Sequence, residues 1–234
     1  MILFLQLLLA HLLADFVFQP DSWIEEKQSK RHKSPKLYLH VLLHGLLSLT
    51  LVADWSFWLY AIAIMVSHFL IDWAKLTLQK DPNQKSWFFI DQLLHLGILL
   101  SVTWAYGKVG PDLSFLNEDQ WLGLITSIVF LSWPTSVLIR ILISGWTPKT
   151  EDTPKESLQN AGKYIGILER LFIFIFILTD HWEGIGFLLA AKSIFRFGDL
   201  KASKERKLTE YVMIGTLLSF GLAILTGIAV ARLY

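Results

Sequence analysis

Four pairs of histidine and aspartate side chains recur in apolar stretches of the first half of the sequence. The pairs are His11 with Asp15, His40 with His44, His68 with Asp72, and Asp91 with His95. The members of each pair are four residues apart, which places both side chains on one face of an α-helix. Neutral imidazoles and carboxylates suit zinc, iron and manganese. The pattern therefore favours a site for one or two divalent transition-metal ions, with all eight side chains as candidate ligands.

A single pair of this kind also has a structural interpretation. A histidine inside a membrane often serves only as a hydrogen-bonding group between helices, and a histidine next to an aspartate could satisfy its own hydrogen bonds. Eight such groups, however, would be costly to bury without a common partner. Eight ligands are more than one tetrahedral site can use. Either two metals bind, or some of these groups hydrogen-bond to histidine ligands and orient them without binding the metal.

The stretches that carry the pairs belong to a chain with the composition of a membrane protein. Charged residues make up 18% of the 234 residues, against about 25% in soluble domains, which is too little to cover a water-exposed surface. The sequence has no cysteine, which excludes a disulfide scaffold and a cysteine-ligated metal site. The net charge of +1 gives no overall case for a nucleic-acid partner.

Eight stretches approach the length of about 20 apolar helical residues that a bilayer core requires. They are 2–19, 37–54, 57–78, 87–106, 121–144, 164–180, 184–197 and 209–232. The stretch 184–197 is short, so it could be a half-span, a tilted helix extended at both ends, or a re-entrant segment. The sequence therefore predicts an all-α, polytopic membrane helix bundle with about eight transmembrane helices.

Lysine and arginine gather in every second predicted loop. The basic loops are 20–36, 79–86, 145–163 and 198–208, whereas the loops between them carry a single lysine. Because basic loops face the cytoplasm, both termini are predicted to lie outside. All four pairs then lie at one depth in the cytoplasmic half of the membrane, where four helices can present them to one site, as in di-iron carboxylate bundles.

An internal repeat relates the first two stretches to the next two. HLLADF at 11–16 matches HFLIDW at 68–73, and KLYLHVLLHGLLSL at 36–49 aligns with WFFIDQLLHLGILL at 87–100. The two hairpins, 1–54 and 57–106, have the same predicted orientation. We therefore expect a parallel repeat of helical hairpins, with its axis along the membrane normal.

Two membrane units are expected from this pattern. The first covers residues 1–106, has four helices and carries the His/Asp site. The second covers 107–234, also has four helices, and includes a cytoplasmic linker at 145–163 that contains two Thr-Pro steps. Pro134 is expected to kink the fifth span.

Other polar side chains are candidates for contact with a substrate. They are Gln19, Lys75, Gln92, Glu169, Arg170, Lys192 and Arg196. The first three lie beside the pairs and could contact substrate oxygens; alternatively, the lysine extends to the interface and the glutamines bridge other groups. The last four form either ion pairs and headgroup contacts or a cationic pocket for a phosphate or carboxylate.

Several motifs bear on the family of the chain. They are HLLADFVFQ, LHVLLH, HFLIDWAK, DQLLH, AGKYIGILERL, IGFLLAAKSIFRFGDL and EYVMIGTLLSF. Together they resemble a bacterial inner-membrane family catalogued as domain of unknown function 3307. The resemblance implies a multi-pass protein of the bacterial inner membrane and no established activity. The N-terminal motifs also resemble predicted membrane-bound metal-dependent hydrolases, which by analogy gives the eight His/Asp residues a metal role.

We expect a metal-dependent hydrolase that acts at the cytoplasmic leaflet on a phosphate-bearing lipid or small molecule. The metal would activate a water molecule, and Asp15 or Asp91, if not a ligand, would act as the general base. The alternatives are a transporter coupled to protons or metal ions, and a scaffold subunit whose polar core is structural. Membrane lipids are expected partners, and an oligomer is left open.

Overall fold

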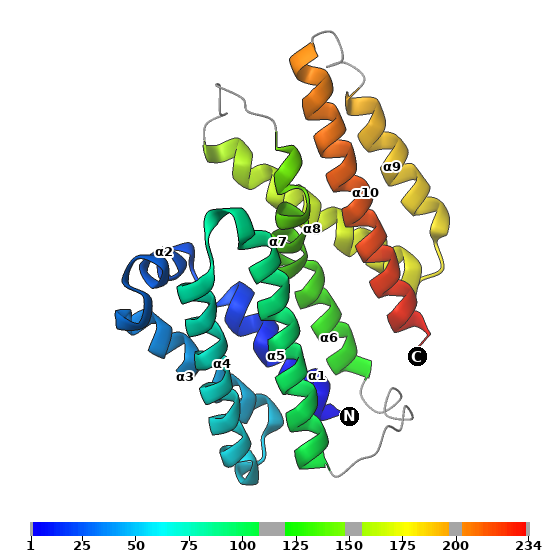
Figure 1. Cartoon of the computed structure of the whole chain (residues 1–234). Helices are drawn as coiled ribbons and strands as arrows, with labels where there is room; N and C mark the ends of the chain where they lie inside the picture. Colours follow the sequence, from blue (N-terminus) through cyan, green and yellow to red (C-terminus); the bar gives the residue numbers. More distant parts are fainter. Residues whose placement is uncertain (1, 108–119, 148–155, 197–202, 233–234) are drawn as a thin grey trace. The chain divides into compact units, whose positions relative to one another are not determined.

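The computed structural model describes residues 2–107, 120–147, 156–196 and 203–232. Every regular element in these ranges is a helix, so the predicted all-α class is confirmed (Figure 1). The helices are α1 Ile2–Leu12, α2 Asp21–Lys30, α3 Pro35–Val52, α4 Trp58–Leu78, α5 Gln84–Gly107, α6 Gln120–Leu131, α7 Trp133–Leu142, α8 Glu156–Leu178, α9 Trp182–Arg196 and α10 Ser203–Ala231.

Several of these helices are long and apolar enough to cross a membrane. Among the described residues, four pass this test: α3, α5, Trp55–Leu78 and Lys207–Ala231. Two bent pairs raise the number to six, and they join Ile2–Val17 to Asp21–Lys33 at 82° and Gln120–Leu131 to Trp133–Leu142 at 41°. Four to six candidate spans are consistent with a membrane protein. Eight spans and external termini stay predictions.

The contacts divide the chain into two units, residues 1–126 and 127–234. In the first unit, α1 packs against α3 and α5, and α4 packs against the same two helices. Neighbouring helices of this bundle run in opposite directions (Figure 1). Leu7, Phe57, Ile64 and Leu99 form its apolar core. The predicted boundary after residue 106 lies within this unit.

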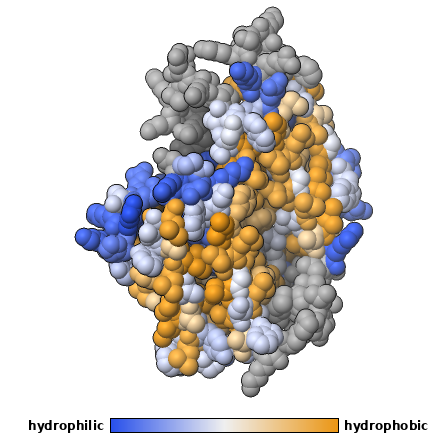
Figure 2. All heavy atoms as spheres, in the orientation of Figure 1, coloured by the Kyte–Doolittle hydropathy of each residue, from blue (hydrophilic) through white to orange (hydrophobic). Residues whose placement is uncertain are grey.

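The outer faces of the first unit are apolar. Leu46, Leu59, Val66, Leu93 and Trp104 are all more than half exposed, and Figure 2 shows hydrophobic side chains covering one face of this bundle, with hydrophilic ones over α2. A contiguous exposed apolar surface is unfavourable in water and favourable in lipid. The outer surface therefore agrees with insertion in a membrane.

The segment 20–36 is not the loop that the sequence predicted. It contains α2, which begins directly after Pro20 and ends at Lys30. The many charged residues of this segment favoured a loop, but α2 is an amphipathic surface helix in which Trp23 and Ile24 are half-buried. Pro35 then occupies the first turn of α3, where its missing N–H costs nothing.

In the second unit, α10 packs along α8, which also contacts α7 and α9. The approach of α10 to α8 is close at Gly227, where a Cβ atom would meet Ile177 at 2.8 Å. The predicted span 121–144 is broken between α6 and α7, so the kink expected at Pro134 is confirmed. Residues 148–155 of the predicted linker lie outside the described residues.

Candidate metal centre

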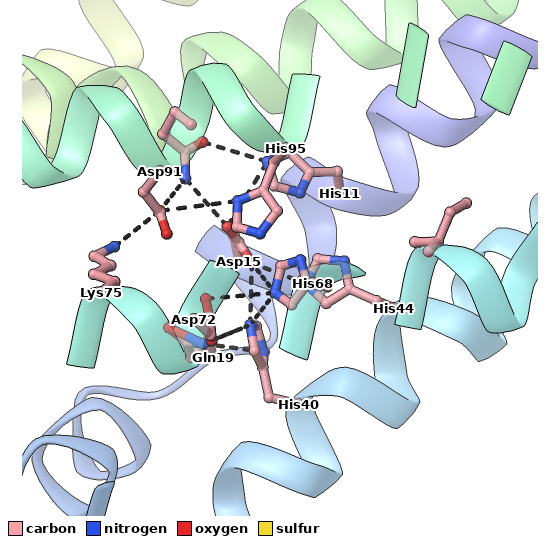
Figure 3. A network of polar contacts seen from close by, with 12 residues as sticks. His11, Asp15, Gln19, His40, His44, His68, Asp72, Lys75, Asp91 and His95 are labelled. Atoms are coloured by element: carbon pink, nitrogen blue, oxygen red, sulfur yellow. Dashed lines mark hydrogen bonds and ion pairs between the residues drawn. The ribbon is translucent and has the colours of Figure 1, made fainter. Parts of the chain in front are cut away.

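The structure brings all eight predicted ligands together inside the first unit (Figure 3). Because neighbouring helices are antiparallel and each pair is spaced by one turn, the side chains form two layers. The first layer, which lines a small cavity, is His11, His44, His68 and His95. The second layer is Asp15, His40, Asp72 and Asp91. One layer is entirely imidazole, and the other contains all three carboxylates.

Asp15 is the point on which the histidines converge. Its Oδ1 atom lies 2.9 Å from Nε2 of His44, 3.1 Å from Nε2 of His40 and 3.7 Å from Nε2 of His68. Its other oxygen lies 3.7 Å from Nε2 of His11. In the part of the chain that the structure describes, no lysine or arginine pairs with this carboxylate.

The backbone that presents Asp15 is a π-helical turn, Leu13–Val17, which continues α1. It closes with a hydrogen bond from the Phe18 N–H to the Leu13 carbonyl, 2.8 Å long. Such turns are rare and occur frequently at functional sites. The sequence predicted an ordinary helix here, because a π turn has no simple pattern of residue types.

Three overlapping groups have ligand atoms that all lie within 4.8 Å of one another. The groups are His11, Asp15, His44 and His68; His40, His68 and Asp72; and Asp72, Asp91 and His95. The first and third groups, which we name the imidazole group and the carboxylate group, share no residue. The imidazole group offers three ring nitrogens and one carboxylate, a donor set that fits zinc.

Two lysines stand beside the carboxylate group. Lys75 places its Nζ atom 2.9 Å from Oδ2 of Asp91, so it does not simply extend to the interface. Lys27 of α2 places its Nζ atom 3.0 Å from Oδ2 of Asp72, and both side chains are buried. Asp72 and Asp91 therefore each have a cationic partner, unlike Asp15.

Lys27 is the site residue that the sequence reasoning missed, because it fell in a predicted loop. The available signal was its spacing from Trp23 and Ile24, four and three residues earlier, which puts all three on one face of a helix. A lysine on the apolar face of a short helix beside a membrane site needs an acidic partner.

The two glutamines connect the ligands to one another. Gln19 places its amide nitrogen 3.0 Å from a ring nitrogen of His40. The amide nitrogen of Gln92 donates to Asp15 at 3.3 Å and to Asp91 at 3.1 Å, and its oxygen lies 3.3 Å from Nε2 of His11. Both side chains thus hold the cluster together, as the bridging alternative expects.

The remaining predicted residues belong to the second unit. Glu169 of α8 forms an ion pair with Lys192 of α9, one of the pairings that the sequence favoured. The side chain of Arg196 lies outside the described residues. Arg170 is buried, and its hydrogen bonds go to carbonyls and hydroxyls of the chain.

The side chain of Arg170 binds the break between α6 and α7. Its guanidinium donates to the backbone carbonyls of Leu131 and Ser132, and also to the hydroxyls of Ser136 and Ser219. Pro134 supplies no N–H at the break, and the Thr135 hydroxyl donates to the Phe130 carbonyl instead. Arg170 therefore has structural contacts: it donates hydrogen bonds to backbone carbonyls at the point where the helix is broken.

The fold and the site together define a helical protein with apolar outer faces and a buried cluster of imidazoles and carboxylates. Residues 3–124 match the family described as "Protein of unknown function (DUF3307)", and the chain belongs to this family. The matched segment contains all eight predicted ligands and nearly coincides with the first unit. No curated protein and no solved structure matches the chain.

Proposed function

We propose that the protein is a membrane-embedded metal protein whose first ion is held by the imidazole group. The observation that carries this proposal is the convergence of imidazole nitrogens on Asp15, a largely buried carboxylate that pairs with no described lysine or arginine. A divalent ion would supply the missing positive charge and use the ring lone pairs. Zinc, iron and manganese all suit this donor set.

The activity that we propose is metal-dependent hydrolysis. A bound metal would activate water and polarise the bond to be cleaved. Of the two candidate bases, Asp15 belongs to the imidazole group, so Asp91 is the general base where a single ion is bound. A phosphate-bearing lipid or small molecule is the proposed substrate, since Lys75 stands beside Asp91 and is partly exposed.

The proposed setting is the bacterial inner membrane, with eight spans, both termini outside and the site in the cytoplasmic half. The exposed apolar surface of the first unit supports the membrane setting. The lysines and the arginine of residues 27–36 support this orientation. The two hairpins α1–α3 and α4–α5 each contribute two pairs to the site, in agreement with a parallel repeat.

A transporter coupled to protons or metal ions is the second candidate. It is favoured by the helix break that Arg170 stabilises, because interrupted helices are typical of transporters. A scaffold subunit would use the same polar cluster only to set helix register, and it would bind no metal.

Metal analysis of the detergent-purified chain tests the proposal. Protein prepared without chelator should contain at least one equivalent of a transition metal, and His44→Ala should contain one equivalent less. His181→Ala is the matched control, since His181 is an exposed histidine whose side chain hydrogen-bonds to the Thr179 hydroxyl. Metal-free wild-type protein, or a metal content that His44→Ala leaves unchanged, would contradict the metal centre.

A further inference from the structure

Three buried polar atoms of the described residues have no hydrogen-bond partner, and all three lie in one corner of the site. They are Oδ1 of Asp91 and both ring nitrogens of His95. His95 is 3% exposed and Asp91 is 2% exposed, so bulk water does not reach them. Buried polar atoms are nearly always paired. These three atoms are therefore available to a ligand.

The carboxylate group is the only one of the three ligand groups that contains these unpaired atoms. Nδ1 of His95 lies 3.9 Å from Oδ2 of Asp91, too far for a hydrogen bond. Two ligand atoms that each lie about 2.1 Å from one metal ion are about 3–4 Å apart. The ring of His95 and the carboxylate of Asp91 thus lie close enough to share one ion, which would bind the unpaired Oδ1 because Oδ2 already accepts a hydrogen bond from Lys75.

We infer that a second divalent transition-metal ion binds at Asp72, Asp91 and His95, separately from the ion of the imidazole group. Its donor set is one imidazole and two carboxylates, richer in oxygen than the first, and suits manganese or ferrous iron. The inference rests on the proposed metal centre, because both ions occupy one cluster.

A water molecule alone does not account for the corner. The cavity beside His11, His44, His68 and His95 has a volume of about 10 Å³, which admits about one water. Such a water could serve one ring nitrogen of His95. The other ring nitrogen would still need a partner, and so would Oδ1 of Asp91.

The two lysines set the strength of this second site. Lys27 and Lys75 already neutralise Asp72 and Asp91, each through the Oδ2 atom of the carboxylate. An ion that binds through Oδ1 of Asp91 keeps the contact with Lys75 but is repelled by its ammonium group. The second ion therefore binds more weakly than the first, and loss of the lysine charge strengthens its binding.

This site changes the role of Asp91 in the proposed hydrolase. A carboxylate that binds an ion is not free to accept a proton from water. With both ions bound, Asp91 is a ligand, and two ions can stabilise the attacking and leaving oxygens of a phosphoester.

Equilibrium dialysis against Mn²⁺ and Zn²⁺ tests the inference on the full-length chain, stripped with chelator in detergent. Bound metal is counted by mass spectrometry, and bound Mn²⁺ also by electron paramagnetic resonance. Wild-type protein should bind two equivalents, with the second weaker. His95→Ala and His44→Ala should each retain one. Lys75→Met, which keeps an apolar stem of similar length, should tighten the second equivalent by about tenfold or more.

The outcomes separate the two proposals. One equivalent that His95→Ala retains and His44→Ala loses would overturn the second site and leave the first standing. No bound metal in wild-type protein would overturn both. Loss of all metal in His95→Ala, with Lys75→Met unchanged, would show one shared site and overturn the inference. The gain expected from Lys75→Met cannot come from misfolding, because a damaged site binds less metal.

Discussion

The two units each bury a polar cluster, and the clusters differ in whether the protein satisfies them. In the second unit, every nitrogen of the Arg170 guanidinium donates to a carbonyl or hydroxyl of the chain. In the first unit, Asp91 and His95 hold three unpaired atoms, and Asp15 lacks a cationic partner among the described residues. We call the cluster of the second unit saturated and that of the first unit unsaturated. A saturated cluster stabilises the fold, and the unsaturated one is where we propose that metal binds.

Replacement of Arg170 by alanine tests the saturated side and should have the largest effect. The variant leaves the carbonyls of Leu131 and Ser132 without their donor at a buried helix break. We expect a loss of about 3–5 kcal/mol in the free energy of unfolding. Thermal unfolding in detergent measures it, with Arg140→Ala as control because Arg140 is exposed on α7.

Metal sharpens this test of Arg170. Because the cluster of the second unit is saturated, addition of Zn²⁺ should not restore the stability of the Arg170 variant. If the Arg170→Ala protein is as stable as wild type, the helix break does not depend on the guanidinium. The cluster of the second unit would then not stabilise the fold, and the contrast between the units would fail.

Replacement of Asp15 by asparagine tests the unsaturated side. The change keeps the size of the side chain and removes the charge on which the imidazoles converge. We expect metal affinity to fall about a hundredfold, or about 2.7 kcal/mol. The metal-free protein should become no less stable, because a largely buried charge without a cationic partner among the described residues is gone. Dialysis and unfolding in chelator measure the two effects.

The opposite result for Asp15→Asn would remove the distinction between the clusters. If the metal-free variant unfolded as readily as Arg170→Ala, the carboxylate would be a structural group like the arginine. The aspartate and its imidazoles would then support the scaffold alternative rather than the metal centre.

The sequence predicted which side chains the structure brings together because their information is local. His11 and Asp15, like Asp91 and His95, are one turn apart in apolar helices, so their shared face follows from helix geometry alone. Their convergence follows from the cost of exposing eight polar groups to lipid. The division into two layers also follows, once neighbouring helices are antiparallel.

What the sequence could not supply depends on contacts between distant segments. Arg170 gave no sign that it would stabilise a break 34 to 39 residues earlier, because its partners there are backbone carbonyls and a serine hydroxyl, which carry no pattern in the sequence. The π turn at Asp15 has no residue signature. The many charged residues of segment 20–36 led to the prediction of a loop in place of α2. The contact between Lys27 and Asp72 was therefore not predicted.

Replacement of Lys27 by methionine separates the two kinds of polar contact within the first unit and should have the smallest effect of the three. The variant removes the cation of Asp72 and keeps the apolar stem. We expect a loss of about 2 kcal/mol in the stability of the metal-free protein. If the second ion binds Asp72, saturating Mn²⁺ should recover most of this loss, because the ion replaces the missing charge. Unfolding with and without Mn²⁺ measures both, and Lys30→Met, an exposed lysine of the same helix, is the control. If Mn²⁺ leaves the loss of stability unchanged, the ion pair of Lys27 is structural, like the contacts of Arg170. Part of the polar cluster of the first unit would then be satisfied by the protein itself.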